Sequence, residues 1–311
     1  MRVRPPPEAH MQTMKQKVLV IVGATASGKT SLSLTLAQEF SGEIISADSR
    51  QLYKTLDIGT GKVTKEEMQG VPHHLIDIVA PTETYNADDF KRDASKCIKE
   101  ITARANLPII AGGTFFYVDT LLGKITSPNV PPNPALREKL QLMSAEELYN
   151  ELRERDPRRA AEMDPHNTRR LVRALEIVAH LGYVPKIPTD TPYDVLTIGI
   201  KREKEELRSR FKIRAQQWLK AGFMNEIKKL LANGITRDRL KEIGFEYTLA
   251  LELYGNEIDE ETFLQKFIEK NWQYAKKQIA WLKKDESIVW VEVKNGNNDA
   301  TKKIVKDFLY R

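Results

Sequence analysis

The stretch VLVIVGATASGKT (18–30) decides the fold of this 311-residue chain. Its first six residues form a β-branched apolar run without a polar interruption, which is typical of a strand buried on both faces of a parallel sheet. The rest, GATASGKT (23–30), has a glycine, four residues and then Gly-Lys-Thr, which is the spacing of a phosphate-binding loop, or P-loop. A helical pattern of leucines follows, so the loop lies between a strand and a helix, as this motif requires.

The P-loop predicts a site for a diphosphate or a triphosphate. Its backbone amides converge on phosphate oxygens at the positive end of the following helix, Lys29 adds a full charge, and Thr30 offers a hydroxyl to Mg²⁺. The predicted diphosphate-binding residues are Gly23, Thr25, Ala26, Ser27, Gly28, Lys29 and Thr30, with Thr30 as the metal ligand. The loop alone does not identify the phosphate compound. Asp48 and Asp77 both qualify as the acidic residue that a nucleotide-hydrolysing enzyme or kinase would use to hold Mg²⁺.

Further strand-like runs predict an α/β fold with a doubly wound, mostly parallel sheet. They are EIISAD (43–48), LIDIV (75–79), LPIIAGG (107–113), VLTIGI (195–200) and SIVWVEV (287–293). Residues 127–192 show no strand-like run, begin in a proline-rich boundary, and carry a capping box at Ser144–Glu147, so we expect a helical insertion domain there. The predicted organisation is a disordered tail at 1–16, the first part of the P-loop core at 17–126, the insertion at 127–192, and completion of the core with C-terminal helices at 193–311.

Composition excludes several classes of protein. The formal net charge of +6 permits an anionic partner without requiring one. The single cysteine, Cys97, can form neither an internal disulfide nor a zinc site by itself, which favours a cytoplasmic protein. The first 16 residues lack the apolar core of a signal peptide and the run at 18–23 is too short to span a bilayer, so no membrane association is expected.

Several motifs together resemble the tRNA dimethylallyltransferases. They are ISADSRQLYKTLDIGTGK (45–62), PHHLIDI (72–78), YNADDFKRDA (85–94), PIIAGGTFFYVDTLL (108–122), NTRRLVRALEI (167–177) and AKKQIAWLK (275–283). The resemblance runs in order from about residue 17 to 290. It implies transfer of a dimethylallyl group from dimethylallyl diphosphate to the exocyclic amine of the adenine on the 3′ side of the anticodon, with Mg²⁺ as cofactor. The P-loop would then hold an isoprenoid diphosphate.

The resemblance also assigns roles to individual residues. Asp48 matches the family's general base, Thr114 a threonine near the reacting centre, and Arg214 an arginine that reaches the diphosphate. The residues implied to contact tRNA are Asp48, Ser49, Arg50, Gln51, Arg137, Arg169, Arg170, Arg173, Lys241 and Phe245. A monomer that binds the tRNA anticodon arm is expected, with the adenine flipped out of its stack to reach the site.

Some positions depart from the family pattern. Glu246 stands where an arginine is usual and would repel phosphate unless Lys241 or Tyr247 compensates, and Trp272 replaces another common arginine. Gly61 and Val63 stand for the usual alanine and proline. These changes concern the grip on tRNA and leave the predicted catalytic residues intact.

Three other functions remain open from the residues. An enzyme that prenylates free adenine nucleotides would share the P-loop and Asp48 but would have no use for an arginine-bearing insertion. A P-loop small-molecule kinase or ATPase would bind a nucleotide instead of a prenyl donor. A non-catalytic RNA-binding module would have no use for a complete P-loop beside Asp48.

Overall fold

The computed structural model describes residues 15–126, 128, 130–187, 190–293 and 298–311. The predicted disordered tail lies almost wholly outside these ranges, and the first strand begins at Gln16. The chain divides into two compact units, of which the larger comprises residues up to Leu122 together with Thr191–Arg311. The smaller unit is Gly123–Asp190, whereas the insertion was expected at 127–192.

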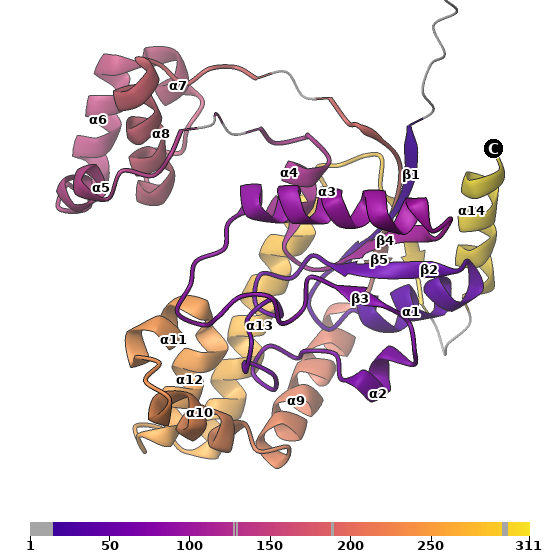
Figure 1. The fold of residues 1–311 in the computed structure, drawn as a ribbon. Helices are drawn as coiled ribbons and strands as arrows, with labels where there is room; N and C mark the ends of the chain where they lie inside the picture. The colour runs from indigo at the N-terminus through magenta and orange to yellow at the C-terminus, as the bar shows by residue number, and fades with distance from the viewer. Residues whose placement is uncertain (1–14, 127, 129, 188–189, 294–297) are drawn as a thin grey trace, which may run out of the picture. The chain divides into compact units, whose positions relative to one another are not determined.

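A six-stranded sheet with the order β3-β2-β4-β1-β5-β6 forms the centre of the larger unit (Figure 1). Every recorded pairing is parallel. The strands are β1 (Gln16–Gly23), β2 (Gly42–Ser46), β3 (His73–His74), β4 (Leu107–Ala111), β5 (Tyr193–Lys201) and β6 (Val289–Glu292). The α/β class and the mostly parallel sheet are thus confirmed.

Helices cover both faces of this sheet. The helices of the larger unit are α1 (Lys29–Glu39), α2 (Lys65–Met68), α3 (Ala87–Ala103), α4 (Phe115–Leu121), α9 (Lys204–Lys220), α10 (Phe223–Ala232), α11 (Arg237–Ile243), α12 (Phe245–Tyr254), α13 (Glu260–Leu282) and α14 (Asp299–Tyr310). Alternate residues of β1 face opposite sides, as the two-residue period of a strand requires. Val18 and Val20 pack in a cluster with residues of α3 and α13, whereas Leu19 and Ile21 pack in another with residues of α1 and α14.

The smaller unit contains helices only, within its described residues. They are α5 (Pro134–Gln141), α6 (Ala145–Arg155), α7 (Pro157–Ala161) and α8 (Thr168–Leu181). Helix α6 begins with the predicted capping box, in which Ser144 and Glu147 bond each other's backbone amides. The two ends of the unit lie against each other: a Cβ on Gly123 would stand 2.2 Å from the Asp190 carbonyl oxygen, so a side chain cannot fit there.

One predicted strand is wrong. The run at 75–79 alternates like a strand, but β3 lies two residues earlier, at His73–His74. Leu75 and Asp77 have φ values of 60° and 56°, which is left-handed backbone that cannot continue a strand. Val79 keeps an isolated parallel bridge to Tyr53, so the segment passes beside the sheet as a loop.

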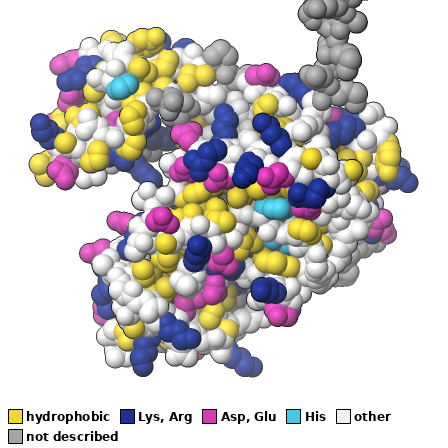
Figure 2. All heavy atoms as spheres, viewed as in Figure 1, with side chains coloured by type: hydrophobic (Ala, Val, Ile, Leu, Met, Phe, Trp, Pro, Cys, Tyr) yellow, Lys and Arg dark blue, Asp and Glu magenta, His cyan; other side chains and the backbone are white. Residues whose placement is uncertain are grey.

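None of the helices in the described ranges is both long and apolar enough to cross a bilayer. Figure 2 shows basic and acidic side chains interspersed on the viewed face, with apolar side chains between them.

Candidate active site

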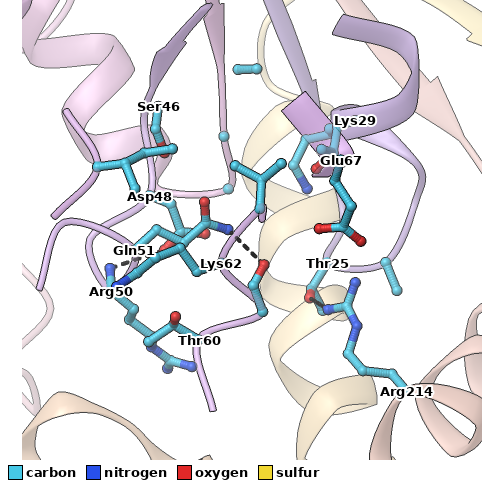
Figure 3. Close-up of a pocket in the computed structure, with 18 of the residues that line it drawn as sticks. Thr25, Lys29, Ser46, Asp48, Arg50, Gln51, Thr60, Lys62, Glu67 and Arg214 are labelled. Carbon is cyan, nitrogen blue, oxygen red and sulfur yellow. Dashed lines mark hydrogen bonds between the residues drawn. The ribbon is translucent and has the colours of Figure 1, made fainter. Parts of the chain in front are cut away.

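A cavity of about 880 Å³ opens at the carboxyl ends of the parallel strands. In parallel α/β sheets this edge is where ligands bind. The P-loop and Lys29 form one wall, and the segment from Asp48 to Gln51 forms another. Figure 3 shows Asp48, Arg50 and Gln51 grouped on one side and Thr25, Lys29 and Arg214 on the other. The cavity therefore combines a phosphate cradle with a carboxylate.

Two backbone carbonyl groups of the P-loop hold the Lys29 ammonium. Its Nζ donates to the carbonyl oxygens of Gly23 at 3.0 Å and Ala24 at 2.9 Å. Burial lowers the pKa of Lys29 from 10.5 to about 8, an effect that the Asp48 carboxylate opposes and the Arg214 guanidinium reinforces. A bound diphosphate would reverse this shift, because an anion favours the charged ammonium.

Helix α9 brings further arginines to the P-loop. Arg214 Nη1 donates to Thr25 Oγ1 at 3.2 Å, and burial lowers the pKa of Arg214. Arg202, just before the helix, donates to the Ser27 carbonyl at 3.0 Å and is held by Glu206 at 2.7 Å. The hydroxyl of Ser27 is buried without a partner in the described structure. The structure thus places Arg214 beside Thr25 of the P-loop, and its contact with a diphosphate stays a prediction.

Asp48 and Thr114 come from neighbouring strands and meet through Ser49. The Asp48 Oδ1 atom accepts from the Arg50 amide at 2.9 Å, which fixes the turn that follows β2. Thr114 occupies the position before α4, but its hydroxyl bonds Ser49 instead of its own helix. It accepts from the Ser49 amide at 3.0 Å and lies 3.2 Å from the Ser49 hydroxyl. Thr114 therefore supports the turn that carries Asp48.

The structure explains the unusual Glu246. Its carboxylate is almost fully buried and forms an ion pair with Arg50. Although burial opposes the charge, the Glu246 carboxylate raises the pKa of Arg50. The Arg50 guanidinium also lies 5.5 Å from the Phe245 ring and 5.7 Å from the Tyr274 ring. The compensation thus comes from Arg50 rather than from the two residues expected to supply it.

Lys241 and Tyr247, the two residues expected to compensate for Glu246, contact other acidic side chains. Lys241 is exposed and lies 3.6 Å from Asp238, and the Tyr247 hydroxyl donates to Glu226 at 2.9 Å. Trp272, the other departure from the pattern, packs with the cluster around Phe211, with Lys204 over its ring at 5.7 Å. Lys241, Tyr247 and Trp272 do not line the cavity, so these contacts leave its lining residues unchanged.

The four arginines of the smaller unit that were predicted to contact tRNA fall into two pairs. Arg137 forms two hydrogen bonds of 2.8 Å to the buried carboxylate of Glu176, and Arg173 bonds the same carboxylate at 3.4 Å. Both arginines neutralise this buried charge, and the pair between Arg137 and Glu176 joins α5 to α8. Arg169 and Arg170 are exposed in the first turn of α8.

Sequence reasoning gave no role to Gln278, which joins the two halves of the site. Its Oε1 accepts from the Thr25 amide at 2.8 Å, and its Nε2 donates to the Gly113 carbonyl at 3.0 Å. The motif AKKQIAWLK contained this residue, and Tyr274 four positions earlier on the same helix also lines the cavity. Helical spacing alone could have paired them on one face.

Comparisons with known proteins agree in sequence and in structure. The family model described as IPP transferase matches residues 51–285. The chain is 38% identical over 286 residues to the tRNA dimethylallyltransferase of Alkaliphilus metalliredigens, covering 89% of this chain and 92% of the relative. The solved tRNA isopentenylpyrophosphate transferase of Bacillus halodurans is 34% identical with a TM-score of 0.71, and the coverage is 95% of this chain and 96% of that one.

A solved eukaryotic dimethylallyltransferase, described as acting on tRNA, gives a TM-score of 0.82 at 28% identity, over 94% of this chain and 79% of its own. The matched residues include the Asp48-adjacent turn from Gln51, the loop at 57–62, and the part of α13 that carries Gln278. Sequence and fold agree, and the chain belongs to the IPP transferase family.

Proposed function

We propose that this protein transfers a dimethylallyl group from dimethylallyl diphosphate to the exocyclic amine of the adenine on the 3′ side of the tRNA anticodon. The observation that carries the proposal is the P-loop, with its half-buried Lys29 ammonium, facing Asp48 across one cavity in a chain of this family. Curated relatives of 34–38% identity carry the name tRNA dimethylallyltransferase. The adenine-nucleotide and kinase alternatives lack this support.

The P-loop binds the diphosphate of the donor. Lys29, the loop amides and Arg214 neutralise the charge that grows on the leaving oxygen as the allylic carbon–oxygen bond breaks. Gln278 holds the Thr25 amide in place from behind. The departing group is pyrophosphate, which takes the electron pair of the broken bond.

Asp48 orients the acceptor. The adenine nitrogen forms a bond to the first carbon of the dimethylallyl group, and one of its protons passes to the Asp48 carboxylate. Thr114 and Ser49 keep the turn that carries Asp48 in position. Gln51 offers a donor and an acceptor to a base edge.

Mg²⁺ fits the donor set of this cavity. Thr30 lines the cavity at the start of α1, and the described residues contain no group of three His, Cys, Asp or Glu side chains that could hold a metal by themselves. Such a setting suits Mg²⁺, which is commonly held by one or two protein oxygens, water and substrate phosphates. We propose Thr30 as its protein ligand, where the ion would supply additional charge neutralisation on the diphosphate.

Arg169 and Arg170 are the proposed phosphate contacts of the helical unit. Both are exposed on one turn of α8, whereas Arg137 and Arg173 are paired with the buried Glu176 carboxylate. Phosphate contacts of this kind contribute salt-dependent affinity. A monomer is sufficient for the proposed reaction, because the P-loop, Asp48 and Arg214 come from the same chain.

One assay tests the proposal. The protein is incubated with Mg²⁺ and dimethylallyl diphosphate labelled in the prenyl group, together with unmodified tRNA, AMP or ATP in parallel reactions. Label in tRNA at the adenine beside the anticodon is the expected result. Label in AMP instead of tRNA, or ATP turnover without prenyl transfer, would overturn the proposal in favour of the nucleotide-prenylating or kinase alternative.

A further inference from the structure

The loop at 57–62 forms part of the cavity wall but contributes none of the predicted catalytic residues. It is a compact turn, closed by hydrogen bonds from the Gly61 amide to the Ile58 carbonyl at 2.9 Å and from the Lys62 amide to the Asp57 carbonyl at 3.0 Å. The Lys62 ammonium donates to the Tyr53 carbonyl at 2.8 Å and also bonds Asp57. The conformation of this loop is therefore strongly constrained.

A buried carboxylate holds the loop from behind. Glu226, on α10, is 9% exposed. Its Oε2 atom accepts from the amides of Asp57 at 2.9 Å and Ile58 at 2.6 Å, and its Oε1 atom accepts from the Gly59 amide at 3.1 Å. Three consecutive amides thus point at one carboxylate, which is the arrangement of an anion-binding nest.

Tyr247 completes the anchor. Its hydroxyl donates to Glu226 Oε1 at 2.9 Å, so the carboxylate accepts four hydrogen bonds in all. Burial and the nearby Glu226 carboxylate raise the pKa of Tyr247, which keeps its hydroxyl protonated as a donor. The loop packs too closely for a side chain at Gly59, where a Cβ would stand 2.4 Å from the Phe223 ring.

The loop in turn fixes Gln51. The Gln51 amide nitrogen donates to the Gly61 carbonyl at 3.2 Å (Figure 3). Since the two atoms of a glutamine amide have opposite hydrogen-bonding character, this bond decides which of them stays available. Within the described part of the chain, the Gln51 side-chain oxygen accepts no hydrogen bond, so it remains free for a donor on a ligand.

We propose that Glu226, with Tyr247, is a positioning residue that holds the loop at 57–62 so that Gly61 presents the Gln51 side-chain oxygen to the acceptor base. The inference rests on the proposed function, because it deepens the account of the same cavity. Glu226 touches neither substrate and acts through the loop. Its effect is confined to the acceptor side, because none of its hydrogen bonds involves the P-loop.

The exchange Glu226→Gln tests this in the full chain. The two side chains have nearly the same shape, but the amide group turns an NH₂ toward backbone donors and leaves at least one of them unpaired. We expect kcat/KM for tRNA to fall about tenfold while the affinity for inorganic pyrophosphate with Mg²⁺ stays the same. Tyr247→Phe removes a single hydrogen bond of the four and should give a smaller loss in the same direction.

A double-mutant cycle with Gln51→Ala identifies the route of the effect. If Glu226 acts through Gln51, the double variant should lose no more than about twice what Gln51→Ala loses alone. Losses that multiply would overturn the proposal, as would an unchanged kcat/KM in Glu226→Gln or a parallel loss of pyrophosphate affinity. Glu252→Gln on α12 is the matched control, because its carboxylate pairs with Lys266 at 2.9 Å away from the cavity.

Amide hydrogen exchange tests the loop anchor independently of enzymatic activity. In Glu226→Gln the amides of residues 57–59 should exchange faster than in the wild type, and those of the P-loop should not. Wild-type protein that prenylates no tRNA would overturn the proposed function, and unchanged exchange at 57–59 would overturn the loop anchor whatever the activity. If Glu226→Gln melts far below the wild type, Tyr247→Phe takes its place in the kinetic and the hydrogen-exchange measurements.

Discussion

Replacing Lys29 with methionine should make the empty protein more stable at neutral pH while it weakens diphosphate binding. The lysine ammonium is held in the P-loop, where burial lowers its pKa from 10.5 to about 8. A folded-state pKa below the unfolded value means that folding opposes the charged form. This penalty is complete below pH 8 and disappears as the pH rises toward 10.5.

The size of the effect follows from these pKa values. Their difference of about 2.5 corresponds to about 3 kcal/mol in a fully enclosed site. Lys29 is only half-buried beside an open cavity, so we expect about 2 kcal/mol of it to act. Methionine cannot donate the hydrogen bonds that Lys29 makes to the carbonyls of Gly23 and Ala24. Each lost bond costs about 0.5 kcal/mol, because water can replace the ammonium there. The variant should therefore be about 1 kcal/mol more stable at pH 7 and about 1 kcal/mol less stable near pH 10.5.

Urea unfolding at pH 7 and pH 10 measures the change. The difference in free energy of unfolding between Lys29→Met and the wild type should reverse its sign between these two values. Lys212→Met, an exposed lysine on α9, controls for charge removal and should show a nearly constant difference. A Lys29→Met protein that is equally destabilised at both pH values would refute the reasoning. Calorimetry with pyrophosphate should show about 10- to 100-fold weaker binding, as expected for loss of a charged hydrogen-bond donor.

Three further outcomes are expected. Asp48→Asn should lower kcat for prenyl transfer by about 100-fold or more while pyrophosphate binding persists, because it removes the proton acceptor and keeps the shape; near-wild-type turnover would remove Asp48 from that role. Arg170→Glu should raise the Kd for tRNA and reduce its salt dependence, as measured by filter binding, without changing pyrophosphate affinity; equal loss of both would indicate misfolding. Glu176→Leu should lower the melting temperature, because it leaves Arg137 and Arg173 without their common partner; an unchanged melting temperature would contradict the structural role assigned to this pair.

The sequence predicts best those parts of the site that are contiguous. The P-loop and its supports, β1 and α1, are read directly because strand, loop and helix follow one another between Gln16 and Glu39. Asp48 could be predicted because it follows β2, which ends at the same edge of the sheet as β1. The capping box at Ser144 is equally local.

The parts that could not be predicted depend on distant partners. Gln278 meets Thr25 across 253 positions, and Glu226 meets Asp57 across 169, so no local pattern reveals either contact. The family resemblance implied that Arg137 and Arg173 contact tRNA, but it did not reveal that Glu176 pairs with both. The strand expected at 75–79 failed because alternating apolar residues report burial, whereas the backbone there turns through left-handed conformations.

The two ends of the helical unit lie close together, so the unit could be deleted from the chain without separating the strands on either side. Gly123 and Asp190 touch, and the Thr126 hydroxyl lies 3.4 Å from the Ile187 carbonyl, so the chain leaves and re-enters the sheet domain through a narrow neck. Joining Leu122 to Thr191 with a short linker would keep β4, α4 and β5 in sequence. On the proposed function, the trimmed protein should keep its affinity for pyrophosphate, because the P-loop and Arg214 both lie in the larger unit.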